Sequence, residues 1–246
     1  MGSLPQALAI PSYFLASGEW ERMRASGQVG LAIVNPDTGP GIKRDDRYAR
    51  YVKQSQDAGV RVLGYVDTAY AQQSERPAAH VCADVDDYFT WYEVDGIFLD
   101  QVPFDGRYGP YYRAITRHVK NLDPTALTVI NPGVFPDEEF MALADIVVTF
   151  ENDYFNYEHL YPEEPAWVAG YSEDRFWHLI YGASSQAELS RALALSRARR
   201  AGWVYVTPYT TDPLDPQSGR LNPWAALPTE PYWIAQITGL SQVPAQ

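Results

Sequence analysis

Short apolar segments alternate with helix-like segments along nearly the whole of this chain. Several of the apolar segments, such as 29–34, are apolar on both faces, as expected of parallel strands that are covered on both sides. The eight segments that we predict to be strands are 8–14, 29–35, 61–68, 96–101, 127–133, 145–152, 176–182 and 203–209. This alternation favours an α/β fold with a parallel sheet.

Six of the intervening segments have the character of helices. The last of them has the clearest boundaries, because Ser185 and Glu188 form a capping-box pattern and Gly202 follows a basic end. The predicted helices are 18–25, 45–58, 85–91, 110–122, 137–143 and 185–201. Eight strands with their helices in 246 residues predict a (β/α)8 TIM barrel, built as a single domain over 1–246. A doubly wound open sheet is the alternative, but no glycine fingerprint follows an early strand.

The charged and sulfur-bearing residues exclude several classes of partner and site. With 19 Lys and Arg against 31 Asp and Glu, the net charge is −12, which argues against a nucleic-acid partner. Cys82 is the single cysteine, so an internal disulfide is excluded, and the four histidines are too far apart in sequence to predict a metal site. We expect no cofactor and a monomer. No apolar run is long enough to span a membrane, and residues 1–9 lack the pattern of a signal peptide.

The motifs of several common enzyme classes are missing from the sequence. No G-x-S-x-G elbow supports a hydrolytic serine, and no P-loop supports binding of a nucleotide phosphate. None of the three lysines ends a predicted strand, which disfavours an aldolase-like Schiff base on a small metabolite. Carboxylates and aromatic rings are the chemistry-bearing groups that remain.

Two carboxylates stand out because each follows an apolar strand. Asp100 ends the fourth predicted strand, and Glu151 follows the apolar part of the sixth. The C-terminal ends of barrel strands form the catalytic rim, where the two groups can face each other as glycoside hydrolysis requires. Their separation would distinguish retention (about 5–5.5 Å) from inversion (about 6.5–9.5 Å) of the anomeric centre. For Asp100, capping of the next segment is the alternative role.

Other polar and aromatic side chains lie at or near the predicted strand ends. A sugar offers hydroxyl groups and an apolar face, so hydrogen-bonding groups and aromatic rings at this rim predict a sugar site. The predicted substrate-binding residues are Tyr13, Asn35, Tyr65, Asp67, Tyr70, Gln101, Asn131, Tyr154, Tyr205 and Tyr209, and Tyr157, Trp167 and Trp224 are further candidate stacking rings. Asn35 and Asn131 each precede a proline, so a role in a turn is an equal alternative for both.

Six segments of the chain resemble, in order, the spherulin-4-like family, also called spherulation-specific family 4 and classed as glycoside hydrolase family 135. They are 10–13 (IPSY), 35–41 (NPDTGPG), 64–70 (GYVDTAY), 96–100 (GIFLD), 131–133 (NPG) and 144–151, which begins AD and ends FE. The resemblance implies a (β/α)8 barrel and secretion to the cell exterior. It also implies endo-cleavage of α-1,4-linked N-acetylgalactosamine in galactosaminogalactan, an exopolysaccharide of biofilms. Related barrel families act on partly deacetylated galactosamine polymers.

At the end of the fourth strand the sequence departs from this family. Asp100 and Glu151 match family carboxylates, but Gln101 stands where the family often has Glu. Glutamine can hydrogen-bond a sugar but cannot transfer a proton, so a protein that binds amino-sugar polymer without cutting it is the alternative. We favour hydrolysis because two carboxylates suffice. We expect Asp100 to be the nucleophile or electrostatic stabiliser and Glu151 the general acid.

Overall fold

The computed structural model describes residues 6–15, 17–211 and 222–241. Eight parallel strands close into a barrel in the order β1-β2-β3-β4-β5-β6-β7-β8, which confirms the predicted (β/α)8 fold. The strands are β1 (Ala7–Ser12), β2 (Val29–Val34), β3 (Arg61–Asp67), β4 (Gly96–Asp100), β5 (Leu127–Ile130), β6 (Ile146–Asp153), β7 (Phe176–Tyr181) and β8 (Trp203–Val206). The helices are α1 (Gly18–Ala25), α2 (Asp46–Asp57), α3 (Ala78–Tyr92), α4 (Gly109–Leu122), α5 (Tyr154–His159), α6 (Gln186–Ala198) and α7 (Glu230–Ser241). Among the helices of the described ranges, none is long and apolar enough to cross a membrane.

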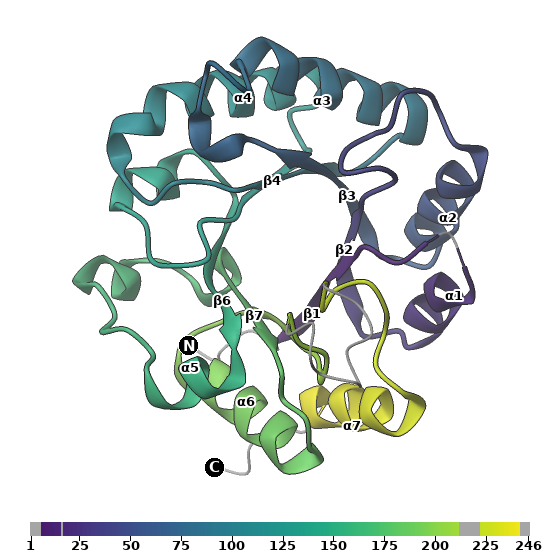
Figure 1. Ribbon diagram of the computed structural model, residues 1–246, viewed down its shortest axis with the longest axis vertical. Helices are drawn as coiled ribbons and strands as arrows, with labels where there is room; N and C mark the ends of the chain where they lie inside the picture. The colour runs from purple at the N-terminus through teal and green to yellow at the C-terminus, as the bar shows by residue number, and fades with distance from the viewer. Residues whose placement is uncertain (1–5, 16, 212–221, 242–246) are drawn as a thin grey trace. The chain divides into compact units, whose positions relative to one another are not determined.

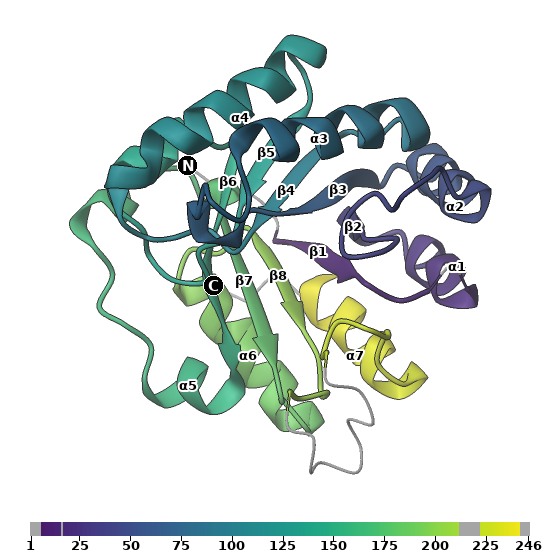
Figure 2. The same cartoon turned by 45° about the horizontal axis from the view of Figure 1, so that its top comes forward.

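The chain forms two compact parts, and the first comprises Leu31–Thr149. Strands β3, β4 and β5 pair in parallel with a register that aligns Asp67 with Asp100 at their C-terminal ends. Helices α3 and α4 lie side by side along these strands (Figures 1 and 2). Close packing requires a glycine at position 64 of β3, because a Cβ there would overlap the ring of Tyr88 on α3. This part therefore places three neighbouring strand ends at fixed relative positions.

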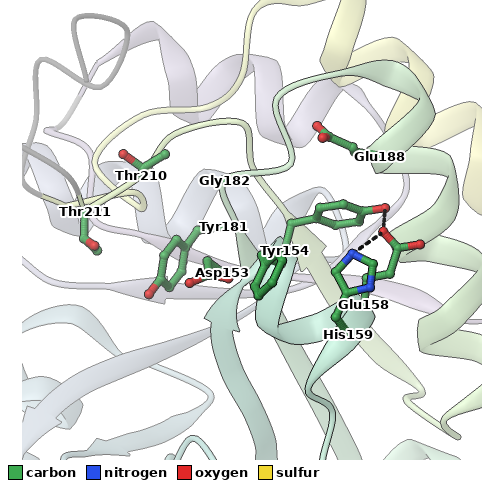
Figure 3. A pocket seen from close by; sticks show the side chains of 10 residues that line it. Asp153, Tyr154, Glu158, His159, Tyr181, Gly182, Glu188, Thr210 and Thr211 are labelled. Carbon is green, nitrogen blue, oxygen red and sulfur yellow. Dashed lines mark hydrogen bonds and ion pairs between the residues drawn. The ribbon is translucent and has the colours of Figure 1, made fainter. Parts of the chain in front are cut away.

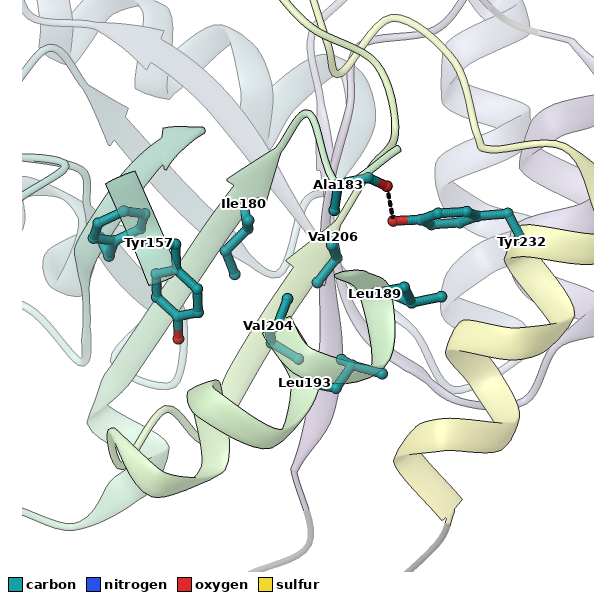
Figure 4. Packing of buried hydrophobic residues seen from close by; sticks show 10 residues of the cluster. Tyr157, Ile180, Ala183, Leu189, Leu193, Val204, Val206 and Tyr232 are labelled. Atoms are coloured by element: carbon teal, nitrogen blue, oxygen red, sulfur yellow. Dashed lines mark hydrogen bonds between the residues drawn. The ribbon is translucent and has the colours of Figure 1, made fainter. Parts of the chain in front are cut away.

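The second part comprises Met1–Gly30 with Phe150–Gln246, of which residues 6–15, 17–30, 150–211 and 222–241 are described. Its core lies between β7, β8 and helices α5, α6 and α7 (Figure 4). The labelled side chains of this cluster are Tyr157, Ile180, Ala183, Leu189, Leu193, Val204, Val206 and Tyr232. The hydroxyl of Tyr232 donates to the carbonyl of Ala183 at 2.9 Å, so α7 is attached directly to the loop after β7.

Element types agree with the sequence-based prediction better than element boundaries do. All strands except β6 end one to three residues earlier than predicted, and β6 ends one residue later. Helix α3 begins at Ala78, directly after Pro77, rather than at residue 85. The helix predicted for 137–143 is a 3-10 turn, Glu138–Ala142, and helices α5 and α7 were not predicted. Part of the proline-rich segment 207–216 that we predicted to be a loop, residues 212–216, lies outside the described residues.

The capping box at the start of α6 is present as predicted. The Ser185 hydroxyl accepts from the Glu188 backbone N–H at 3.2 Å, and the Glu188 carboxylate accepts from the Ser185 N–H at 2.9 Å. We therefore expect Ser185→Ala to lower the free energy of unfolding by about 1 kcal/mol, because one backbone donor loses its acceptor. Urea denaturation would measure this loss. Ser74→Ala, which changes an exposed hydroxyl away from α6, is the control, and equal losses in the two variants would contradict the capping role.

Candidate active site at the ends of the barrel strands

Asp100 is the last residue of β4, and side chains from both neighbouring strands hold its carboxylate. The hydroxyl of Tyr65, on β3, donates to Oδ2 at 2.9 Å. The amide of Asn131, directly after β5, donates from Nδ2 to Oδ1 at 2.8 Å. Both carboxylate oxygens are thus fixed by donors on separate strands, so the carboxylate has a defined orientation.

The environment of Asp100 raises its pKa above the ordinary value for an aspartate. Burial is the largest cause, because it disfavours the charged form, and the negative charge of Asp67 on the paired strand acts in the same direction. The backbone of Gln101 and the side chains of Tyr65 and Asn131 oppose this rise by hydrogen-bonding the carboxylate. A carboxylate with this combination of burial and specific donors is typical of a functional site.

Removal of the Tyr65 hydroxyl should raise the pKa of Asp100 further. Tyr65→Phe keeps the ring but deletes a donor that favours the ionised carboxylate, so the protonated form gains population. NMR titration of the aspartate carboxyl carbons would measure the change, with Tyr108→Phe as a control that leaves Asp100 untouched. A titration of Asp100 that stays unchanged or moves to lower pH would contradict the assigned hydrogen bond.

The loop after β3 presents an exposed aromatic ring next to the end of β4. Ala69, Tyr70 and Ala71 all have left-handed backbone conformations, with φ of 45°, 53° and 60°, and Gln101 has φ of 54°. The Tyr70 N–H donates to the carbonyl of Gln101 at 2.8 Å, and the Thr68 hydroxyl donates to the same carbonyl at 2.9 Å. Strained backbone of this kind persists only where its surroundings hold it. The ring of Tyr70 is 52% exposed, as a stacking surface must be.

Glu151 lies on β6, two residues before the end of the strand. The indole N–H of Trp224 donates to its Oε1 at 3.1 Å. The ring of Tyr181, at the end of β7, meets the Trp224 ring edge to face at a centroid distance of 6.2 Å. The Tyr181 hydroxyl donates to Oδ1 of Asn152 at 3.1 Å. Trp224 and Tyr181 therefore order this end of β6, and Trp224 holds the carboxylate of Glu151.

Several residues that we predicted to bind or stack on the substrate lie inside the protein instead. Tyr205 is 1% exposed, with its ring 5.8 Å from that of Trp224, and Tyr157 lies wholly in the core below β7. Tyr65 is buried on the barrel strand, and Trp224 is 5% exposed. Their rings have no free face for a sugar, because close packing in the barrel covers both sides of each ring. For Tyr65 and Trp224 the structure shows another role, since each donates to a candidate catalytic carboxylate.

The other predicted binding residues have mixed surroundings. Oδ1 of Asn35 accepts from the Gly39 N–H at 2.9 Å, and Oδ1 of Asp67 accepts from the Ala69 N–H at 2.6 Å, so both side chains stabilise turns. The Tyr154 hydroxyl donates to Glu158, and the Tyr209 hydroxyl donates to the Leu227 carbonyl. Tyr13 is half-buried directly after β1. Gln101 is half-buried, and within the described part of the chain its side-chain amide has no hydrogen-bond partner.

A cavity of about 700 Å³ lies beyond the ends of β6 and β7 (Figure 3). It is lined by Asp153, Tyr154, Phe155, Glu158, His159, Tyr181, Gly182, Glu188, Thr210 and Thr211. Apart from Tyr154, none of these residues was predicted to bind substrate. Four of the ten lie on α5, which was not predicted, because the hydrophobic pattern of its six residues is too short to identify a helix.

Comparison with known proteins identifies the family. The model of the spherulation-specific family 4 matches residues 7–235. The chain belongs to this family. Spherulin-4 of Physarum polycephalum is 29% identical over 219 residues, which cover 83% of this chain and 64% of that protein. This member of the spherulation-specific family 4 thus spans less than two thirds of the curated relative that it matches.

Solved structures of glycoside hydrolases share the fold of this family member. Aspergillus clavatus Sph3 in complex with GalNAc superimposes with a TM-score of 0.76 at 23% identity, over 97% of this chain and 98% of that one. A chitinase from Chromobacterium violaceum gives 0.61 at 11% identity over 98% and 100% of the two chains. The glycoside hydrolase domain of PelA from Pseudomonas aeruginosa gives 0.51 at 13% identity over 83% and 96%. At these identities the likeness is one of fold, and it agrees with the closed barrel.

Proposed function

We propose that this chain is an endo-acting glycoside hydrolase that cleaves α-1,4-linked N-acetylgalactosamine or galactosamine exopolysaccharide with Asp100 and Glu151 as its catalytic carboxylates. The observation that carries the proposal is the Asp100 carboxylate at the end of β4, where Tyr65 and Asn131 each hold one of its oxygens. Catalytic groups of barrel enzymes occupy such strand ends. A buried carboxylate oriented by donors has the preorganisation that catalysis requires.

The relatives support a carbohydrate substrate of this class. Sph3 has been solved with GalNAc, and chitinases and the PelA hydrolase domain share the barrel. The match to the barrel of Sph3, which was solved with GalNAc, extends over nearly the full length of both chains and supports an amino-sugar substrate for this member of the spherulation-specific family 4. The exposed ring of Tyr70 supports stacking of a sugar face close to the end of β4.

The two carboxylates have different surroundings, and this supports different roles. Burial raises the pKa of Asp100, and its two side-chain donors oppose that rise by favouring the ionised form, which a nucleophile or an electrostatic stabiliser of the oxocarbenium-like transition state needs. We assign the general acid to Glu151, which protonates the leaving glycosidic oxygen as the C–O bond breaks. The indole N–H of Trp224 orients this carboxyl group by donating to its Oε1.

Gln101 is compatible with this division of roles. Its backbone carbonyl accepts hydrogen bonds from the Tyr70 N–H and the Thr68 hydroxyl, so the residue organises the loop next to Asp100. Its side-chain amide can hydrogen-bond a sugar hydroxyl or acetamide without taking part in proton transfer. The alternative is a barrel that binds amino-sugar polymer without cutting it, which the substitution of Gln for a family Glu favours.

A panel of polysaccharides distinguishes hydrolysis from binding. Each polymer is assayed for release of reducing ends and, in parallel, for retardation of the protein in polymer-containing native gels. The proposed function predicts release from α-1,4-linked N-acetylgalactosamine or galactosamine polymer and none from chitin. Retardation without any release would support the binding alternative and contradict the hydrolase.

We also propose that the chain acts outside the cell as a single-domain monomer. Secretion follows from the family resemblance, since an exopolysaccharide substrate lies outside the cell. Light scattering coupled to size-exclusion chromatography tests the oligomeric state, and a mass near 27.7 kDa is the expected result for this chain. A mass of twice this value would contradict the monomer.

A further inference from the structure

The cavity beyond β6 and β7 has the size of a ligand site, and neither Asp100 nor Glu151 is among its lining residues. Its volume of about 700 Å³ falls within the range of small-molecule sites, roughly 300–1,000 Å³. Figure 3 shows its walls, which come from the end of β6, from α5, from the end of β7 and from the start of α6. The backbone enters it at Gly182, where φ is +72° and a Cβ would lie 3.6 Å from Thr210 and 3.9 Å from Asp153.

Aromatic rings form much of the cavity wall. Phe155 is 60% exposed, although it is a large apolar side chain, and its ring packs only against the His159 ring at 4.9 Å among the ring contacts described. Tyr154 and Tyr181 also line the cavity. Sugars stack their apolar ring faces on such surfaces, so an exposed ring beside hydrogen-bonding groups fits a pyranose unit.

The charge of the cavity is negative, and its carboxylates are fixed in place. Oε2 of Glu158 accepts from the Tyr154 hydroxyl at 2.6 Å, and its Oε1 accepts from Nε of Arg191 at 3.0 Å. These two hydrogen bonds lower the pKa of Glu158. Asp153 caps α5, and Glu188 forms the capping box of α6. Arg191 pairs with Glu158 from outside the lining, and Nε2 of His159 lies 3.7 Å from the same carboxylate, so the three lining carboxylates outnumber the one arginine beside them.

Tyr181 links the cavity to the end of β6 that carries Glu151. Tyr181 lines the cavity and donates to Asn152, the residue after Glu151. Its ring also packs against Trp224, which donates to Glu151. If one sugar unit of a polymer is bound at Glu151, a neighbouring unit could therefore reach the cavity at the end of β7.

We propose that this cavity is a subsite for a hexosamine unit with a free amino group, so that the substrate is a partly deacetylated amino-sugar polymer. The ammonium group would lie against the carboxylates of Glu158 and Asp153, and the apolar face of the sugar would stack on Phe155. This subsite rests on the proposed function, because it binds a neighbouring unit of the same polymer. The subsite adds to the proposed function that a sugar unit next to the cleaved one carries a positive charge.

The test is a binding measurement that does not require catalysis. Oligomers of α-1,4-linked galactosamine, either fully N-acetylated or with free amino groups, are titrated into the Asp100→Asn protein by calorimetry. We expect the oligomers with free amines to bind more tightly, and Glu158→Gln to reduce that preference roughly 5-fold, the size of one half-exposed ion pair. Phe155→Ala should weaken binding of both oligomers by removing the stacking ring. Glu163→Gln, an exposed carboxylate outside the cavity, is the charge-matched control and should leave the preference unchanged.

Each outcome decides between the two proposals. A preference for the free amines that falls in Glu158→Gln and not in Glu163→Gln supports the subsite. Equal binding of the two oligomers, or an equal loss of preference in both Gln variants, overturns it, and thermal melts of each variant exclude misfolding as the cause. If wild-type protein cleaves an amino-sugar polymer while the preference is absent, the subsite fails and the proposed function stands. If neither oligomer is bound or cleaved, the proposed function itself fails.

Discussion

Asp100→Asn should lower hydrolysis of the polymer by about 10³-fold, the effect expected when a catalytic carboxylate is lost. The asparagine has nearly the same shape, so the Tyr65 and Asn131 side chains can stay in place beside it. What changes is the charge, because an amide can neither attack the anomeric carbon nor stabilise a developing oxocarbenium ion. Initial rates of reducing-end release at saturating polymer would measure the loss. The same reasoning applies to Glu151→Gln, which removes the proposed proton donor.

Two controls separate lost chemistry from lost structure. Asp37→Asn makes the same chemical change at an exposed loop position and should keep wild-type activity. Native-gel retardation by the polymer should persist in Asp100→Asn, because the binding groups remain. If Asp100→Asn or Glu151→Gln hydrolyses the polymer at the wild-type rate, that residue is not a catalytic carboxylate.

Acidification should destabilise the protein strongly through one buried histidine. His178 on β7 is wholly buried, and the Tyr157 hydroxyl lies 2.7 Å from its Nδ1. Burial lowers its pKa to about 3, and the charge of Arg199 acts in the same direction. The guanidinium of Arg199 lies over the rings of Tyr157 and Tyr161, at 4.5 Å and 3.9 Å from their centroids. A protonated imidazole at this position would therefore be buried next to a fixed positive charge.

The direction of the pH effect follows from the two pKa values. In the unfolded chain His178 titrates near 6.5, so between pH 6.5 and about 3 the unfolded state binds the proton and the folded state does not. The contribution to stability is complete above pH 6.5 and is lost as the pH falls. At pH 4.5 the loss amounts to about 3 kcal/mol. Urea denaturation at pH 7.0, 5.5 and 4.5 would measure it.

Substitution of His178 isolates its share of the acid effect. His178→Gln should lower stability at pH 7 by disturbing the core, but its stability should decline less between pH 7.0 and 4.5 than that of wild type. His118→Gln changes a half-exposed histidine that pairs with Asp86, and it should leave most of the decline in place. Parallel pH dependences of wild type and His178→Gln would show that His178 is not the cause.

The fold and the positions of the carboxylates could be predicted because both follow from patterns of neighbouring residues in the sequence. An apolar run that ends in a carboxylate indicates a strand, and at Asp100 it also marks the last residue of that strand, whereas β6 continues for two residues past Glu151. The boundaries were less certain. Strand β5 stops at Ile130 because the Asn131-Pro132 pair ends the ladder of backbone hydrogen bonds. The apolar pattern of the sequence alone does not identify this end point.

The partners of the carboxylates could not be predicted from the sequence. Trp224 is separated from Glu151 by 73 positions along the chain, and no local pattern records that contact. Asn131 was correctly placed at a strand end, but the hydrogen bonds of Tyr65 and Asn131 to Asp100 depend on the register of three strands. Tyr205 and Tyr157 were predicted to contact substrate because a tyrosine can either stack on a ligand or fill a core. Only packing decides between these two roles.

Hydrolysis in ¹⁸O-labelled water tests the central claim most directly. Wild-type protein is incubated with α-1,4-linked N-acetylgalactosamine polymer that is partly deacetylated, and the products are analysed by mass spectrometry. The account predicts a series of short oligomers, each with one labelled oxygen at its new reducing end, and no such series from Asp100→Asn. Polymer that binds the wild-type protein but yields no labelled oligomers would contradict the account.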